Sequence, residues 1–211
     1  LTTIQEVLAD ESKMEPLLRE REKEIKRTIR EQRGRLEQVR DYLTQIAQGE
    51  TMNTEITLKS LPEVIVASMR TTVPNYNAFF EIVPKMGEYM NSVGAVCREP
   101  EYCFTIFHND EYREEDIDVE ICEAVTEAKP ESETVKFKTV PGVATAACIQ
   151  HRGSYDTLGE SYNALFSWIE RNGHTPSGHP RESYIDGVWN KDDPADWLTE
   201  VQVPVELRQS T

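Results

Sequence analysis

The most informative segment of the chain is Arg181–Val205, RESYIDGVWNKDDPADWLTEVQVPV. Residues Ser183–Trp189 alternate in polarity and are rich in Tyr, Ile, Val and Trp, which predicts a β-strand. The polar run Asn190–Ala195 contains a proline and is expected to end that strand. Residues Leu198–Val205 alternate again and predict a second strand. The stretch is therefore expected to form a β-hairpin with a long connection.

This hairpin gathers large aromatic residues and acids near the ends of two strands. Such a set suits a lipophilic cation, because aromatic faces attract the cation and a carboxylate neutralises it. Strand alternation places Tyr184 and Asp186 on one face and Trp189 on the other, and leaves open which face meets a ligand. The candidate ligand-binding residues of the hairpin are Tyr184, Asp186, Trp189, Trp197 and Glu200.

Residues from Thr54 onward contain the same pattern twice, in repeats of about 54–126 and 133–207. Each repeat is expected to hold two strands, one helix and two more strands, with the helices at about 78–92 and 157–171. Tyr76 precedes Tyr155 by 79 positions, and Glu120 precedes Glu200 by 80. The pattern predicts an α+β fold made of a duplicated sheet-plus-helix unit, in which the repeats cover each other or share a cleft.

The duplication adds two candidate site residues. Glu120 is the repeat mate of Glu200, and Tyr155 lies in the loop before the second helix. Tyr155 is expected either to cap the cleft or simply to anchor that helix.

The N-terminal segment predicts a short helix and then a coiled-coil helix over about residues 12–48. Its apolar seam repeats every 3.5 residues on average, which is the period of a coiled coil. The seam needs a partner, either the body of the same chain or, as we favour, the same helix in a homodimer. The seam residues are Leu18, Ile25, Ile29, Gln32, Leu36, Val39, Leu43 and Ile46.

The charge is unevenly distributed. Residues 1–50 contain 10 Lys and Arg against 11 Asp and Glu, whereas residues 51–211 contain 13 against 27. Such an acidic domain repels phosphate backbones, so nucleic-acid binding by residues 51–211 is not expected. The sequence shows no membrane-spanning apolar run, signal peptide, paired cysteine motif or catalytic motif, and predicts a cytoplasmic protein without metal or cofactor.

A family resemblance rests on PGVATAACIQHRGSYDTLGESYNALFSWIERNG, residues 141–173, and on DPADWLTEVQVPVEL, residues 193–207. With these segments, residues 54–207 resemble the gyrase-inhibitor-like effector-binding domain. Residues 1–50 resemble the segment that follows the winged helix in MerR-family transcriptional regulators, where a short helix leads into a long dimerisation helix. The whole is most similar to the multidrug-sensing branch of that family.

The resemblance implies an effector-sensing, dimerising, non-enzymatic regulator part that binds a small lipophilic cation between its repeats. Glu200, in the tail motif, is the first candidate for the carboxylate, and Glu120 the second. DNA is expected to be bound only through a winged helix-turn-helix that these residues lack, either by truncation or by natural loss.

Two other functions stay open from the sequence. Some gyrase-inhibitor-like domains hydrolyse electrophilic small molecules with a Glu general base, a role that Glu200 or Glu120 could fill. The coiled coil argues against this alternative. The acidic surface could instead bind a basic protein partner.

Overall fold

The computed structural model describes residues 56–109, 111 and 113–208, together with residues 18, 19, 21, 25 and 26. The last five are helical, and the side chains of Leu18 and Ile25 are exposed in the single chain. The rest of the predicted coiled-coil seam lies outside the described residues, so the homodimer stays a prediction. The chain divides into two units, Leu1–Asn53 and Thr54–Thr211, and the fold described below belongs to the second.

Both repeats have the predicted order of strands and helix. The first comprises β1 (Thr57–Leu61), β2 (Val64–Val73), η1 (Tyr76–Ala78), α3 (Phe79–Ser92), β3 (Cys103–Phe107) and β4 (Ile117–Ala124). The second comprises β5 (Lys136–Val140), β6 (Val143–Arg152), η2 (Tyr155–Thr157), α4 (Leu158–Arg171), β7 (His174–Pro176), β8 (Arg181–Asp186), η3 (Pro194–Asp196) and β9 (Leu198–Leu207). The short strand β7 was not predicted.

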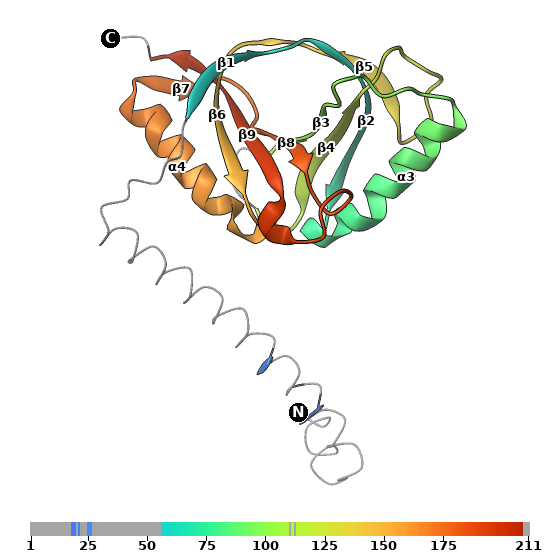
Figure 1. Ribbon diagram of the computed structural model, residues 1–211, viewed down its shortest axis with the longest axis horizontal. Helices are drawn as coiled ribbons and strands as arrows, with labels where there is room; N and C mark the ends of the chain where they lie inside the picture. The colour runs from blue at the N-terminus through green and yellow to red at the C-terminus, as the bar shows by residue number, and fades with distance from the viewer. Residues whose placement is uncertain are drawn as a thin grey trace, which may run out of the picture. The chain divides into compact units, whose positions relative to one another are not determined.

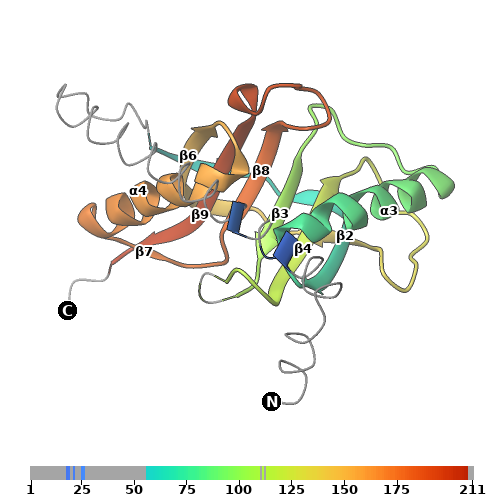
Figure 2. The same ribbon diagram turned by 90° about the horizontal axis from the view of Figure 1, so that it is seen from below.

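The strands form one curled antiparallel sheet in the order β1-β6-β9-β8-β3-β4-β2-β5, with β7 paired to β9 (Figure 1). Seen from below, α4 and α3 lie on the same side of the sheet, one over each half, with the central strands β8 and β3 between them (Figure 2). This architecture confirms the mixed α+β fold, with a curled antiparallel sheet and two helices.

The two repeats exchange their first strands. Strand β1 of the first repeat pairs with β6 of the second, and β5 of the second pairs with β2 of the first. The chain segments that lead out of β1 and β5 pass close together at Gly142. A Cβ atom on Gly142 would lie 3.1 Å from both Glu63 N and Leu61 O, so glycine permits this close backbone approach.

Each helix covers a separate hydrophobic core on the same face of the sheet. Met86 and Met90 of α3 pack on β2, β4 and β5, whereas Leu165 and Ile169 of α4 pack on β6 and β9. The opposite face holds further apolar clusters, one of them around Phe104. Since β9 is covered on both faces, its residues are buried continuously from 199 to 205 instead of alternately.

Strand β9 tolerates a proline because of where its neighbours end. The carbonyl of Pro204 accepts a hydrogen bond from Ser177 N, so the edge of β9 at this residue faces away from β6. On that edge β8 pairs as far as Gln202 and β7 begins pairing at Val205. Pro204 therefore lies between two pairing segments, where a missing N–H breaks no ladder bond.

The predicted strand Ser183–Trp189 is wrong at both ends, because β8 spans Arg181–Asp186. Strand β8 ends at a turn that is closed by hydrogen bonds among its own residues. The Asn190 side chain accepts from Gly187 N at 2.8 Å, and the Gly187 carbonyl accepts from Asn190 N and Lys191 N at 3.0 and 2.9 Å. The predicted pairing with the second hairpin strand is confirmed.

Candidate functional site

The register of β8 and β9 decides which side chains share a face. Glu182 lies opposite Val201, and Tyr184 lies opposite Thr199. Directly paired residues of antiparallel strands point to the same side, and Val201 belongs to the core under α4. Glu182 and Tyr184 therefore face the helices, close to the centre of the sheet.

Glu182 is a buried acid held by two tyrosines. Its side chain accepts a hydrogen bond from the Tyr162 hydroxyl at 2.9 Å and another from the Tyr184 hydroxyl at 3.0 Å. Only 7% of the residue is exposed. No Lys or Arg of the described residues forms an ion pair with it, and burial raises the pKa of Glu182 to about 7 despite the two tyrosine hydrogen bonds. Glu182 can thus change its protonation state near neutral pH.

An aromatic cluster lies on the same side of the sheet. The ring centroid of Tyr155 is 5.8 Å from that of Tyr184 and 4.7 Å from that of Trp197. The Tyr162 ring, which holds Glu182, stacks on Phe166 of the same helix at 6.3 Å. The structure therefore brings together three of the predicted site residues, Tyr155, Tyr184 and Trp197, around an acid that was not predicted.

The other two hairpin candidates belong to the turn after β8. The Asp186 carboxylate accepts from the Asn190 side-chain amide at 2.9 Å and lies 3.8 Å from Lys191 Nζ, so it holds the turn together. Trp189 is 56% exposed and packs against Gly187. Trp189 lies in the loop rather than on a strand face, contrary to the predicted alternation.

Glu200 and Glu120 lie on the opposite face of the sheet from the aromatic cluster. Glu200 pairs with Ser183, the neighbour of Glu182 and Tyr184, so its side chain points the other way. Its carboxylate meets Lys59 Nζ at 2.7 and 2.8 Å and accepts from the Gln202 amide at 2.6 Å. Glu200 is therefore buried and already paired with a cation of its own chain.

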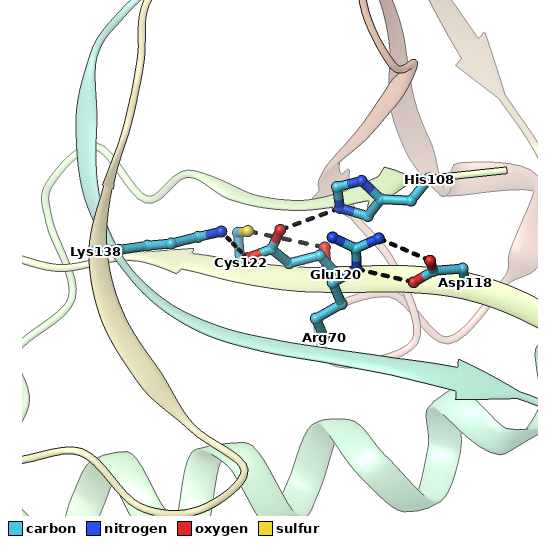
Figure 3. Close-up of polar contacts among 6 residues, drawn as sticks. All are labelled: Arg70, His108, Asp118, Glu120, Cys122 and Lys138. Atoms are coloured by element: carbon cyan, nitrogen blue, oxygen red, sulfur yellow. Dashed lines mark hydrogen bonds and ion pairs between the residues drawn. The ribbon is translucent and has the colours of Figure 1, made fainter. Parts of the chain in front are cut away.

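Glu120 has the equivalent arrangement in the other repeat. It lies between Lys138 Nζ, at 2.5 Å, and His108 Nε2, at 3.1 Å, beside the Arg70–Asp118 ion pair (Figure 3). Burial works to raise the pKa of Glu120, but its hydrogen bonds, first of all that from Lys138, outweigh burial and lower it. Both predicted carboxylates thus have partners, and the expectation that they share one site with Tyr155, Tyr184 and Trp197 is wrong because the sheet separates them.

Sequence reasoning missed Glu182 and Tyr162. Strand alternation could have identified Glu182, because this residue is two positions before Tyr184 and so lies on the same face of the strand. The predicted strand began at Ser183, one residue too late to include it. Tyr162 could be assigned only to a helix from the sequence, because its contact with Glu182 spans 20 residues.

A separate pocket of about 370 Å³ lies between α4 and β7, with Phe166, His174 and Arg208 among its lining residues. None of the predicted site residues lines it. Within the described part of the chain, His, Cys, Asp and Glu form no group of three or more suited to a metal ion. No helix among the described residues has the length and apolar character to cross a membrane.

The curled sheet with one helix over each half is the fold of a small-molecule binding domain. The family model of the GyrI-like small molecule binding domain matches residues 54–206, and the chain belongs to this family. A comparison with curated proteins gave no match.

Solved structures give more specific similarities. The crystal structure of the EcmrR C-terminal domain is 42% identical, with a TM-score of 0.71 over 74% of this chain and 99% of that one. The cryo-EM structure of an EcmrR–DNA complex in EcmrR-RPo is 36% identical, with a TM-score of 0.73 over 98% of this chain and 78% of that one. A hydrolase from Listeria innocua, 10% identical with a TM-score of 0.53 over 77% of this chain and 98% of that one, shows the shared fold alone.

Proposed function

We propose that this chain is the effector-sensing and dimerising part of a MerR-type transcriptional regulator of the multidrug-sensing kind. Its effector is a small lipophilic cation bound at Glu182 between the aromatic side chains. The observation that carries this proposal is Glu182 itself, a buried carboxyl group held by two tyrosine hydroxyls without a cation partner among the described residues.

Charge and aromatic surface account for the ligand class. An uncompensated carboxylate is unfavourable in a buried site, and an incoming cation removes that cost by pairing with it. The rings of Tyr155, Tyr184 and Trp197 offer faces that attract the delocalised charge of an aromatic cation. The net charge of -15 for the whole chain also favours the approach of cations over anions.

The regulator assignment rests on the similarity to the EcmrR–DNA complex, which extends over nearly the whole chain and so includes the N-terminal segment. In this proposal two chains associate through residues about 12–48. DNA is contacted by a winged helix-turn-helix that precedes the dimerisation helix. Effector binding in residues 54–207 changes how the two chains hold that DNA.

The test is calorimetric titration with N-methyl-4-phenylpyridinium and with 4-methylbiphenyl, its neutral isostere. We expect the cation to bind and the isostere to bind at least about tenfold more weakly, equivalent to about 1.4 kcal/mol, because it cannot pair with Glu182. The substitution Glu182→Gln should remove this preference for the cation while leaving the aromatic contacts.

Glu200→Gln is the matched comparison, because it removes the charge of a buried acid on the opposite face. If Glu200→Gln abolishes the preference for the cation and Glu182→Gln keeps it, the carboxylate predicted from the tail motif is the correct one. Equal affinity of wild-type protein for the cation and its isostere would contradict the proposed ligand class.

A further inference from the structure

The turn after β8 contains a glycine, Gly187, whose missing side chain leaves room for two aromatic side chains. Gly187 is buried, and a Cβ atom built on it would lie 2.5 Å from Trp189 Cη2 and 2.6 Å from the Tyr155 hydroxyl. Real Cβ atoms do not approach other heavy atoms so closely. The backbone angles of Gly187 do not require glycine, since positive φ is found at Gly94, Gly153 and Gly173 but not here. Glycine at position 187 is therefore explained by the side chains packed beside it and not by its backbone conformation.

The occupants of that space are the Trp189 indole and the Tyr155 hydroxyl. Both approach one point above Gly187, so the edge of the indole lies beside the polar end of Tyr155. Tyr155 is the ring that contacts both Tyr184 and Trp197 in the aromatic cluster. Trp189 thus stands at the border of the cluster that contains the Glu182 site.

The Trp189 side chain has fewer polar contacts than the turn in which it lies. The turn is fixed by the Asn190 side chain, which bridges Gly187 N and the Asp186 carboxylate. The tryptophan itself is 56% exposed, and its indole has no hydrogen bond of its own among the described contacts. By contrast, Trp197 donates from Nε1 to the Lys191 carbonyl at 3.3 Å. Rotation of the Trp189 side chain therefore breaks no hydrogen bond among the described contacts.

We propose that Trp189 is the movable entrance residue of the Glu182 site, and that Gly187 is the positioning residue that lets its indole rest against Tyr155. An aromatic cation reaches the cluster after the indole swings outward, and the indole then returns to cover it. Gly187 is the place where a side chain would hold the entrance open. This inference rests on the proposed function, because it concerns entry to the same site.

Stopped-flow binding of N-methyl-4-phenylpyridinium to Trp189→Ala distinguishes two roles of Trp189. The side chain either is a gate that must move before the cation enters, or only contacts the bound cation as part of the site wall. A gate that must open slows both association and dissociation, so its removal should raise both rate constants by roughly fivefold with a smaller change in affinity. Val188→Ala, an equally exposed change in the same turn, is the control and should leave both rate constants within about twofold of wild type. Faster dissociation with an unchanged association rate would overturn the gate and make Trp189 part of the binding wall.

A second measurement needs no ligand. Gly187→Ala should push the indole away from Tyr155, so acrylamide should quench the Trp189 emission more strongly than in wild type. The Trp189 signal is isolated by subtracting the emission of Trp189→Phe in each background. Unchanged quenching in Gly187→Ala would overturn the positioning role of Gly187 even if the cation binds as proposed. If wild type does not bind the cation but Gly187→Ala shows increased quenching, the proposed ligand class is refuted. The packing of the Trp189 indole against Tyr155 is then still supported.

Discussion

At the scale of single residues, the raised pKa of Glu182 predicts a pH-dependent affinity for cations. Below about pH 7 the carboxyl group is largely protonated, and a cation must displace that proton to pair with it. The association constant should rise up to about tenfold per pH unit below the pKa and level off above it. Calorimetry between pH 5.5 and 8.5 measures this dependence, and buffers of different ionisation enthalpy report the released proton.

The same raised pKa makes the stability of the ligand-free protein depend on pH. Because the folded-state pKa is above the ordinary value for Glu, the folded protein holds this proton more tightly than the unfolded chain. The contribution of Glu182 to stability is therefore present at acid pH and is lost as pH rises through about 7. Glu182→Gln removes both dependences, and a Glu182→Gln protein whose cation affinity still rises with pH would contradict this assignment.

The sequence singled out Tyr184 and Trp197 from strand ends and aromatic character, and Tyr155 from its place before a helix. The structure brings these three rings together, and their role in binding a ligand stays a prediction. Glu182 and Glu200 are both acids in strands of alternating polarity, so their local sequence patterns are alike. They differ only in the side chains that surround them in the fold. Only the sheet partners show that Lys59 neutralises Glu200, whereas no Lys or Arg among the described residues pairs with Glu182.

At the scale of strands and helices, the exchanged strands β1 and β5 each supply a lysine to an acid of the sheet. Lys59 pairs with Glu200 and Lys138 with Glu120, so one ion pair repeats in both halves. The offset of 80 between the two acids predicted their equivalence. The exchange itself was not predictable, because hydrophobic periodicity describes each strand and not the strand it pairs with.

Replacing Lys138 by Met leaves Glu120 buried without its closest cation. Removing one partner of a buried pair costs about 3–5 kcal/mol, and since the Lys138 side chain is 48% exposed we expect about 2 kcal/mol of unfolding free energy at pH 7. Urea unfolding measures this loss. Because the pKa of Glu120 is lowered in the folded state, the contribution of the pair is present at neutral pH and disappears as pH falls through the folded-state pKa.

Lys136→Met is the matched control on the same strand. Lys136 pairs at 3.4 Å with Glu131, and both of these side chains are about half exposed, so its loss should change stability by less than about 0.5 kcal/mol. Equal effects of the two substitutions would show that burial of Glu120 does not govern the energy of its ion pair.

At the scale of the whole domain, strand exchange means that neither repeat holds a complete core. Val135 and Phe137, next to and within β5, pack in the core under α3 of the first repeat, and Ile56, just before β1, packs in the core under α4 of the second. Each repeat alone loses an edge strand and apolar side chains to its partner. The sequence repeat suggested two units of equal structure, and the pairing shows that they are not independent.

Separate fragments 54–128 and 129–208 should therefore fail to fold alone and should regain structure when mixed. Each isolated fragment is expected to lack cooperative urea unfolding and dispersed amide NMR signals, because its core would expose the surface that the exchanged strand covers. Mixing at equal concentration restores β1–β6 and β5–β2 pairing together with the central β3–β8 contact, and should yield the spectrum of intact 54–208. Gly142→Ala in the second fragment should weaken this association, because its Cβ meets the backbone at Leu61 and Glu63 where the two connections pass. A dispersed spectrum and cooperative unfolding in either fragment alone would show that the exchanged strand is dispensable, and that the duplication still consists of two self-sufficient halves.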